Sequence, residues 1–122
     1  MSLVRWGGEN RQRTNDKGRK TIVMIIYEIT VIIRADLRES YEKYMRETHI
    51  PDLLETGFFG GARFMRAGGN RYRIQYEAFD QTSLDAYLER DAPRLRADFN
   101  AHFAEGVEVV RENWEVLEVW KK

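Results

Sequence analysis

The stretch that decides the fold is Glu47-Thr48-His49-Ile50-Pro51-Asp52-Leu53-Leu54-Glu55-Thr56-Gly57-Phe58-Phe59. Pro51 is excluded from a helix interior, because it lacks an N–H and its ring clashes with the preceding turn. It can open a helix at the first position, and Gly57 can then end that helix in a left-handed conformation. The stretch therefore predicts the end of one helix near His49, a short second helix, and a strand that begins at Phe58.

The residues before this stretch predict a strand and then a helix. Residues 24–33 are rich in β-branched side chains, and their odd positions are all apolar, which is typical of a strand with one dry face. Asp36 predicts a helix N-cap with Glu39 as its reciprocal partner. Apolar residues follow at helical spacing as far as Thr48.

The residues after this stretch predict two strands, a helical region and a last strand. Residues 58–66 and 71–79 favour strands joined by a glycine-rich turn, and Gly60-Gly61 predicts a bulge in the first of them. A capping pair, Thr82 with Asp85, opens a helical region that Pro93 breaks or kinks and that ends at Gly106. The last strand is expected over 107–120, longer than most strands, so part of it is expected to pair outside its own sheet.

The order of these elements predicts the fold class. A strand–helix–strand–strand–helix–strand chain with right-handed crossovers gives an α+β, ferredoxin-like sandwich: a four-stranded antiparallel sheet with both helices on one face. A chain of 122 residues supports one such domain, expected over residues 23–122. Residues 1–22 are polar and aperiodic and are expected to form a flexible N-terminal extension.

Composition excludes several function classes. The absence of cysteine removes disulfides, thiolate nucleophiles and cysteine-based metal sites. No apolar run is long enough for a membrane span and no secretory signal is visible at the N-terminus, so we expect a cytoplasmic protein with no membrane partner. Residues 1–20 hold six basic and two acidic side chains, which leaves 14 basic and 18 acidic ones in the rest. Such a body is a poor phosphate binder, and no nucleic-acid partner is expected.

The sheet face that the two helices leave open is both apolar and charged. It is expected to carry alternate residues of the first three strands: Ile26, Glu28, Thr30, Ile32, Phe59, Gly61, Arg63, Met65, Arg73, Gln75 and Glu77. This mixture suits two copies packed sheet to sheet. We therefore predict a homodimer through the open sheet face. RNA-recognition domains share the element order but need aromatic residues on the third strand, where this chain offers Arg73, Gln75 and Glu77.

Several motifs together resemble a bacterial family of domains of unknown function within the dimeric α/β-barrel superfamily. The likeness covers Met24 to about Trp120 and rests on Met24-Ile25-Ile26-Tyr27-Glu28-Ile29-Thr30-Val31, His49-Ile50-Pro51-Asp52-Leu53-Leu54, Gly57 to Arg63, Tyr72-Arg73-Ile74-Gln75-Tyr76, Ser83 to Leu88 and Ala92 to Arg96. It implies a dimeric α/β barrel. Antibiotic-biosynthesis monooxygenases and muconolactone isomerases are distant relatives by fold alone.

His49 is the candidate catalytic residue. With Asp52 it could form a carboxylate–imidazole pair that acts as a general base near neutral pH, with its pKa raised by Glu47 and Glu55. The alternative is that His49 caps the end of the first helix, where an imidazolium suits the dipole. A metal site is not expected, since His49 and His102 are too few and too far apart in sequence, and no cofactor is expected.

The candidate ligand-binding residues are Glu28, Arg63, Arg73 and Gln75, with Glu77 beside them. They could line a cleft for a polar or anionic small molecule, with Arg63 as the carboxylate clamp, or form a salt-bridge network that fixes the dimer. The leading hypothesis is a small-molecule-binding protein with cofactor-independent monooxygenase or isomerase activity in a cleft between sheet and helices. The alternative is a non-catalytic dimeric binding or stress-response module. An enclosed pocket of about 300 Å³ or more, reached by His49 or Arg63, would favour the first.

Overall fold

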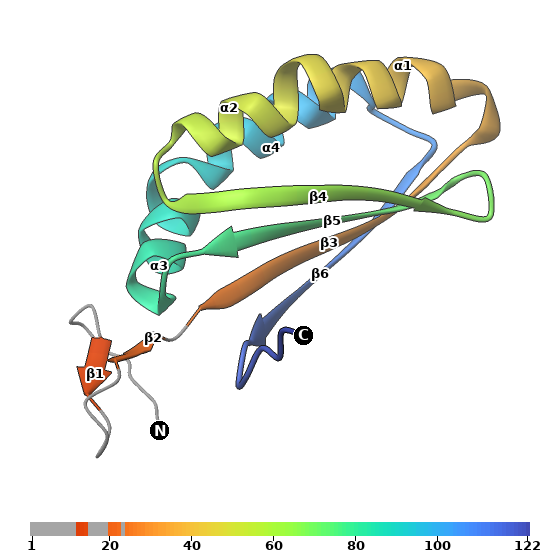
Figure 1. The fold of residues 1–122 in the computed structure, drawn as a ribbon. Coiled ribbons are helices and arrows are strands. Elements are labelled where there is room, and N and C mark those ends of the chain that lie inside the picture. The colour runs from red at the N-terminus through yellow and green to blue at the C-terminus, as the bar shows by residue number, and fades with distance from the viewer. Residues whose placement is uncertain (1–11, 15–19, 23) are drawn as a thin grey trace.

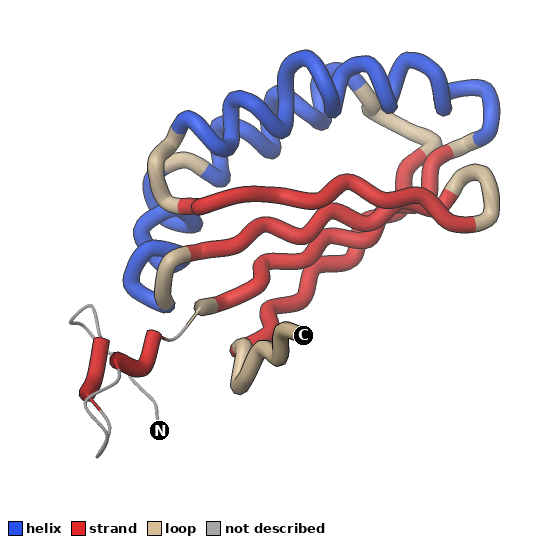
Figure 2. Tube along the Cα trace, viewed as in Figure 1, coloured by secondary structure: helices blue, strands red, loops and turns tan. Residues whose placement is uncertain are grey.

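The structure, a computed structural model, describes residues 12–14, 20–22 and 24–122. Its main sheet has four antiparallel strands: β3 (Ile25–Ile33), β4 (Phe59–Ala67), β5 (Arg71–Ala78) and β6 (Val107–Glu115). They lie in the order β4-β5-β3-β6, so the first and third strands of the domain are central and the crossovers lead to the edges. The helices form a layer over one face (Figures 1 and 2). The predicted ferredoxin-like α+β sandwich is confirmed.

Of the predicted N-terminal extension, the structure describes two short strands. These are β1 (Gln12–Thr14) and β2 (Lys20–Ile22), which pair antiparallel in a separate two-stranded sheet. The rest of residues 1–22 lies outside the described residues, and the predicted flexibility of this extension stays a prediction.

The first crossover is one continuous helical run that contains a π-turn. A 3-10 turn (Ala35–Leu37) leads into α1 (Arg38–Tyr44), the π-turn (Met45–His49) and α2 (Ile50–Glu55). The predicted short second helix is present as α2, with Pro51 in its first turn. The predicted end of the first helix near His49 is wrong, because the chain stays helical there through the π-turn. The amide of Ile50 donates to the carbonyl of Met45, and this wider turn accommodates Pro51, whose ring would strike the carbonyl four residues earlier in a regular helix. Gly57, at φ 87°, ends the run as predicted.

The second crossover is two helices, α3 (Gln81–Arg90) and α4 (Ala92–His102), separated at Asp91 beside Pro93. Both predicted capping pairs are replaced by neighbouring contacts. Asp80, rather than Thr82, caps α3, because its carboxylate accepts from the amide of Ser83 at 2.8 Å. Asp36 makes no capping bond, since its carboxylate is paired with Arg34 at 2.6 Å.

The strands follow the predicted alternation of faces except at Phe59. This residue was predicted on the open face, but it is buried in the core against Tyr27, Tyr76 and Tyr87, because the β4 bulge shifts the alternation between Phe59 and Ala62. The bulge in β4 falls between Phe59 and Ala62, where Gly60 and Gly61 were expected to produce it. The last strand ends at Glu115 rather than Trp120. Beyond it the amide of Val116 still donates to the carbonyl of Met24 at 2.9 Å, but residues 117–122 form no ladder. Within the described part of the chain, no helix is both long enough and apolar enough to span a membrane.

The core lies between the helices and the inner face of the sheet, and it is rich in tyrosine. The side chains that are almost completely buried are Tyr41, Tyr72, Tyr76, Tyr87, Ile33, Leu53, Ile74, Leu84 and Leu95. Tyrosines add large apolar area, but each buried hydroxyl also requires a hydrogen-bond partner. The positions of the tyrosine hydroxyls therefore determine where polar groups are found in the space between the sheet and the helices.

Candidate functional site

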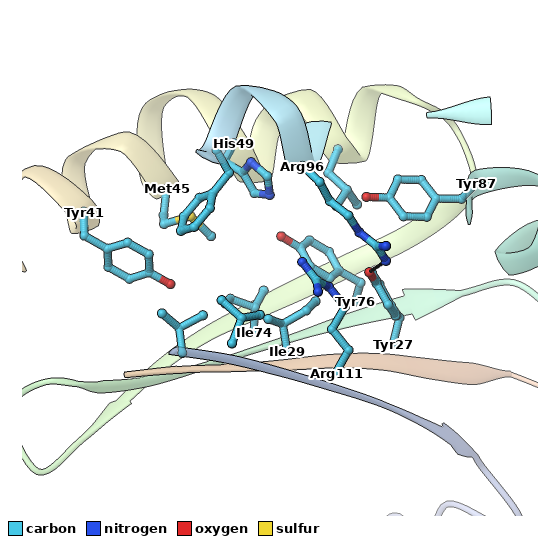
Figure 3. A pocket seen from close by; sticks show the side chains of 14 residues that line it. Tyr27, Ile29, Tyr41, Met45, His49, Ile74, Tyr76, Tyr87, Arg96 and Arg111 are labelled. Carbon is cyan, nitrogen blue, oxygen red and sulfur yellow. Dashed lines mark hydrogen bonds between the residues drawn. The ribbon is translucent and has the colours of Figure 1, made fainter. Parts of the chain in front are cut away.

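A narrow cleft lies between the inner face of the sheet and the helices (Figure 3). Its free volume is about 40 Å³. It is lined from β3 by Tyr27, Ile29 and Val31, from β5 by Ile74 and Tyr76, from β6 by Val109 and Arg111, and from the helical layer by Tyr41, Met45, His49, Leu53, Tyr87, Arg96 and Phe99. Apolar walls with a few polar tips are typical of small-molecule sites, although such sites are usually several times larger.

The π-turn positions His49 above this cleft. A π-turn inserts an extra residue into a helix and is often found at functional sites. Here it ends with His49, whose ring packs beside Tyr44 and Phe99, with centroids 5.8 Å from each. In Figure 3 the imidazole projects from the helix toward the sheet. The predicted catalytic candidate therefore lies in the cleft between sheet and helices.

Burial makes His49 a neutral imidazole. Desolvation, together with the nearby positive charge of Arg111, lowers the pKa of His49 to about 4, although Asp52 and Asp98 oppose the shift. The expectation that Glu47 and Glu55 raise this pKa is not met, because the cost of charging a buried ring outweighs the attraction of nearby carboxylates. The expected pair with Asp52 is also not formed, since Nδ1 of His49 is buried without a hydrogen-bond partner among the described residues.

Three polar atoms of the cleft side chains are buried and unpaired within the described part of the chain: Nδ1 of His49, the hydroxyl of Tyr41 and Nε of Arg96. Most buried polar atoms in folded proteins have a partner, in the protein or in bound water. One cleft hydroxyl is satisfied, because Arg96 donates to Tyr27 at 2.8 Å (dashed line in Figure 3). The other three groups are available to water or to a ligand.

The cleft is cationic. Arg96 enters it from α4 and Arg111 from β6, on opposite sides (Figure 3). Of the described residues that line it, none is a carboxylate. Burial raises the pKa of Tyr41, Tyr76 and Tyr87, so these hydroxyls stay protonated at neutral pH and can donate hydrogen bonds.

Sequence reasoning found His49 but missed both arginines of this site. Arg96 follows Leu95 in α4 and lies three residues before Phe99, a spacing that puts it beside the buried stripe. Arg111 continues the inward series of β6 after Val107 and Val109, and it is opposite Ile29 in the β3 ladder. The alternation of side chains along this strand is known from the sequence, but both of its faces carry charged and apolar residues. The sequence therefore does not show which face points into the cleft.

The four predicted ligand-binding residues lie on the other side of the sheet. Glu28 accepts a hydrogen bond from Gln75 at 2.9 Å and lies 3.7 Å from Nε of Arg73, which also donates to Thr30 at 3.1 Å. Arg63 is exposed and is opposite Gln75 in the β4–β5 ladder. The structure thus brings these residues together on the open face, as predicted, but separates them from His49 by the thickness of the sheet.

Among the described residues, the open face shows a shallow hollow and no enclosed pocket. A shallow hollow of about 270 Å³ lies over β4 and β5 and includes Arg73 and Gln75. From the sequence, we required an enclosed pocket of about 300 Å³ or more, reached by His49 or Arg63. The cleft has a free volume of only about 40 Å³ and does not meet this criterion. His49 lines it and Arg63 does not. Any ligand larger than a few atoms must move side chains to enter.

The residues that the structure describes contain no cluster of three His, Cys, Asp or Glu side chains fit to hold a metal ion. His49 and His102 both pack on the ring of Tyr44, at 5.8 and 4.3 Å between centroids. Nδ1 of His102 lies 2.9 Å from the backbone oxygen of Asp98. The two histidines are therefore neighbours of one aromatic ring.

A family model described as a domain of unknown function (DUF4286) matches residues 24–117. This range covers the whole sandwich from the residue before β3 to two residues past β6. No curated protein matches the chain.

The solved structures that share the fold include the following three. A protein of unknown function from Nitrosomonas europaea is 12% identical, with a TM-score of 0.61 over 83% of this chain and 96% of that one. A protein of the ethyl tert-butyl ether D (EthD) family from Bacillus halodurans is 10% identical, with a TM-score of 0.58 over 72% and 96%. A dimeric ferredoxin-like protein from an uncultured marine organism is 13% identical, with a TM-score of 0.57 over 82% and 100%. At these identities the likeness establishes the fold alone.

Proposed function

This chain belongs to the DUF4286 family, a domain of unknown function, and we propose that it binds a small molecule in the cleft between its sheet and its helices. The observation that carries the proposal is a set of buried polar atoms, on Tyr41, His49 and Arg96, that have no partner in the part of the chain that the structure describes. Leaving a buried donor or acceptor without a partner costs about 1–3 kcal/mol each. A ligand that bonds to these atoms recovers this free energy only in the bound state, which favours binding.

The size of the cleft sets a condition on this function. A free volume of about 40 Å³ accommodates about three water molecules at most. Arg111 is exposed and Arg96 is half-buried, and both are long side chains with several rotatable bonds. A change of rotamer in these two side chains widens the space between them without moving the sheet or the helices. The site therefore opens by side-chain movement as the ligand enters.

The reaction class we propose to test in this cleft is a cofactor-independent oxygenation or isomerisation. His49 is its base, because a neutral imidazole has a lone pair that can accept a proton. A pKa of about 4 makes this imidazole a weak base. The substrate therefore needs an acidic proton, and the anion that forms needs stabilisation by Arg96 or Arg111.

Thermal-shift screening of the purified protein against a metabolite library tests the binding. A ligand that binds only the folded state must raise the melting temperature. The shift is expected to fall by more than half in His49→Ala and to persist in His102→Ala, whose ring lies outside the cleft. Arg63→Ala tests the open face: loss of the shift there would place the ligand on the other side of the sheet. A library that produces no shift, or shifts untouched by His49→Ala, would overturn the proposal.

A different observation supports a second candidate, a non-catalytic dimeric module that pairs through the open sheet face. Large apolar side chains lie exposed on that face and in the tail that follows β6: Ile32, Met65, Val110, Trp114, Leu117, Val119 and Trp120. Contiguous exposed apolar surface marks interaction sites. The Glu28, Arg73 and Gln75 cluster lies among these side chains and would fix the register of the two sheets.

Sedimentation of the full chain at micromolar concentration tests this pairing. We expect a species of twice 14.5 kDa, and we expect Val110→Glu with Trp114→Glu to convert it to monomer. Ala101→Glu is the control, because Ala101 is an exposed residue of α4 in the helical layer and lies away from the open face. A wild-type chain that sediments only as a 14.5 kDa species would rule out the dimer. The two candidates are compatible, since they use opposite faces of one sheet.

A further inference from the structure

Arg96 and Arg111 line the same cleft from opposite walls. Arg96 belongs to α4 in the helical layer and Arg111 to β6 in the sheet (Figure 3). Burial raises the pKa of the Tyr87 hydroxyl and Tyr27 adds to this, while both arginines oppose it. Tyr87 and both arginines line the same cleft, so the two positive charges lie in one partly enclosed space. Two like charges brought together in a partly desolvated space repel one another unless an anion lies between them.

The nearby carboxylates do not supply that anion. Asp91 is paired with Arg94 at 3.0 Å, on the outer side of the break between α3 and α4. Asp52 and Asp98 are exposed, and they influence the charge of His49 without lining the cleft. Among the described residues, the cleft thus contains two cations and no residue that neutralises them inside it.

We propose that the ligand of this cleft is an organic anion, held by its carboxylate or enolate oxygens between Arg96 and Arg111. Its apolar or aromatic body would lie against Met45, Phe99 and the ring of Tyr41, which line the same cavity. Guanidinium groups match the two oxygens of a carboxylate in geometry, and such charge-assisted hydrogen bonds are about twice as strong as neutral ones. The inference depends on the proposed function, because it names the ligand class of that same cleft.

The remaining polar groups favour an anion as well. The Tyr41 hydroxyl is buried and lacks an acceptor among the described residues, so it can donate to a ligand oxygen. The neutral His49 ring can donate through one nitrogen and accept through the other, depending on its tautomer. A cationic ligand would meet two guanidinium groups and no carboxylate, and it would be repelled.

Calorimetric titration with matched pairs of acids and amides tests this ligand class. The probes are acetate, benzoate and 1-naphthoate, each compared with acetamide, benzamide and 1-naphthamide at fixed ionic strength. At least one acid is expected to bind about ten-fold more tightly than its amide, which corresponds to one charge-assisted hydrogen bond. Arg96→Gln and Arg111→Gln are each expected to weaken that acid about ten-fold and to leave the amide unchanged.

Two control variants distinguish binding of the acid at a specific site from general attraction to the positive charge of the protein. Arg90→Gln removes one exposed positive charge from the last turn of α3 and is expected to leave every affinity unchanged. Arg96→Lys retains the charge and is expected to recover part of the affinity, which also covers the case in which Arg96→Gln weakens the fold.

The outcomes test the anionic ligand class separately from small-molecule binding, the proposed function on which it rests. Equal affinity for acid and amide, or equal losses in Arg90→Gln and Arg96→Gln, would overturn the anion while small-molecule binding survives. No binding of any acid would also overturn the anion, and the metabolite screen would then decide small-molecule binding separately. A neutral library ligand whose thermal shift requires His49 would mean that the cleft binds ligands of another class.

Discussion

The two faces of the central sheet hold their polar groups in opposite ways. On the open face, Glu28 is 7% exposed, yet it is bonded to Gln75 and lies beside Arg73. In the cleft, the hydroxyl of Tyr41 and Nδ1 of His49 are also buried, but they have no partner among the described residues. Among the described residues, these polar groups of the open face thus have hydrogen-bond partners, whereas those two groups of the cleft do not.

This difference separates two uses of a buried polar group. A satisfied cluster on an exposed, partly apolar face has little left to offer a ligand, but it is well suited to specify how two surfaces meet. Unsatisfied groups inside a layer cost stability until something bonds to them. This contrast is why we propose assembly through the open face and ligand binding in the cleft.

The largest effect expected from this comparison concerns Ile32 and Ile33, neighbours on β3 that point to opposite faces. Ile33 is fully buried and Ile32 is 39% exposed. Ile33→Ala is expected to lower the free energy of unfolding by about 3–4 kcal/mol, because it opens a cavity in the core. Ile32→Ala is expected to cost about 1 kcal/mol or less. Urea unfolding at low protein concentration measures both.

Equal losses of unfolding free energy in Ile33→Ala and Ile32→Ala would contradict the difference between the two faces of the sheet. They would mean that the open face is covered as completely as the inner face, for example by a tightly bound second copy. A loss at Ile32 that grows with protein concentration would identify that copy as the cause, since only association depends on concentration.

The next effect is the pH dependence that the cleft imposes through His49. Its folded-state pKa of about 4 lies below the unfolded value of 6.5, so the unfolded chain binds more protons between these values. Stability therefore rises with pH from about 4 to 6.5 and is flat above that range, and it is lost as pH falls through the same window. The full difference amounts to about 3 kcal/mol at most. Urea unfolding from pH 7 to pH 4 measures it.

His49→Gln is expected to flatten this part of the profile, because no proton is then gained on unfolding at that position. His102→Gln removes the other histidine, which is exposed at the end of α4, and is expected to retain the slope. A slope that survives in His49→Gln would mean that the ring is charged or solvated in the folded state. The contrast between an incomplete cleft and a complete open face would then be lost.

Most of the fold could be predicted from the sequence, because each secondary-structure element is specified by residues within that element. The alternation in β3, the glycines that bulge β4 and turn the β4–β5 hairpin, and the proline beside Asp91 all act on their own backbone. The one large error in the helices has the same origin. Pro51 does disturb its helix, but the backbone absorbs the disturbance in a π-turn instead of ending the helix.

The cleft could not be predicted in the same way, because its properties depend on packing between distant elements. The sequence shows Glu47 and Glu55 near His49, whereas burial under the helical layer decides the charge of its ring. Arg96 and Arg111 are 15 positions apart in segments rich in charge, and only the crossover that carries α4 over β6 brings them into one cavity. The open-face cluster was easier, since strand register alone predicts it.

The smallest effect is the most direct test of the contrast, because it removes one polar group from each face at nearly constant shape. Gln75→Leu takes away the donor to Glu28 and leaves a buried carboxylate oxygen unpaired, so it is expected to cost about 1–2 kcal/mol. Tyr41→Phe takes away a hydroxyl that has no partner among the described residues, and it is expected to change the free energy of unfolding by less than about 0.5 kcal/mol. Urea unfolding without ligand measures both. A loss at Tyr41 as large as that at Gln75 would show that the hydroxyl already has a partner, such as a bound water. In that case the cleft would be as complete as the open face, and the case for a ligand would rest on the two arginines alone.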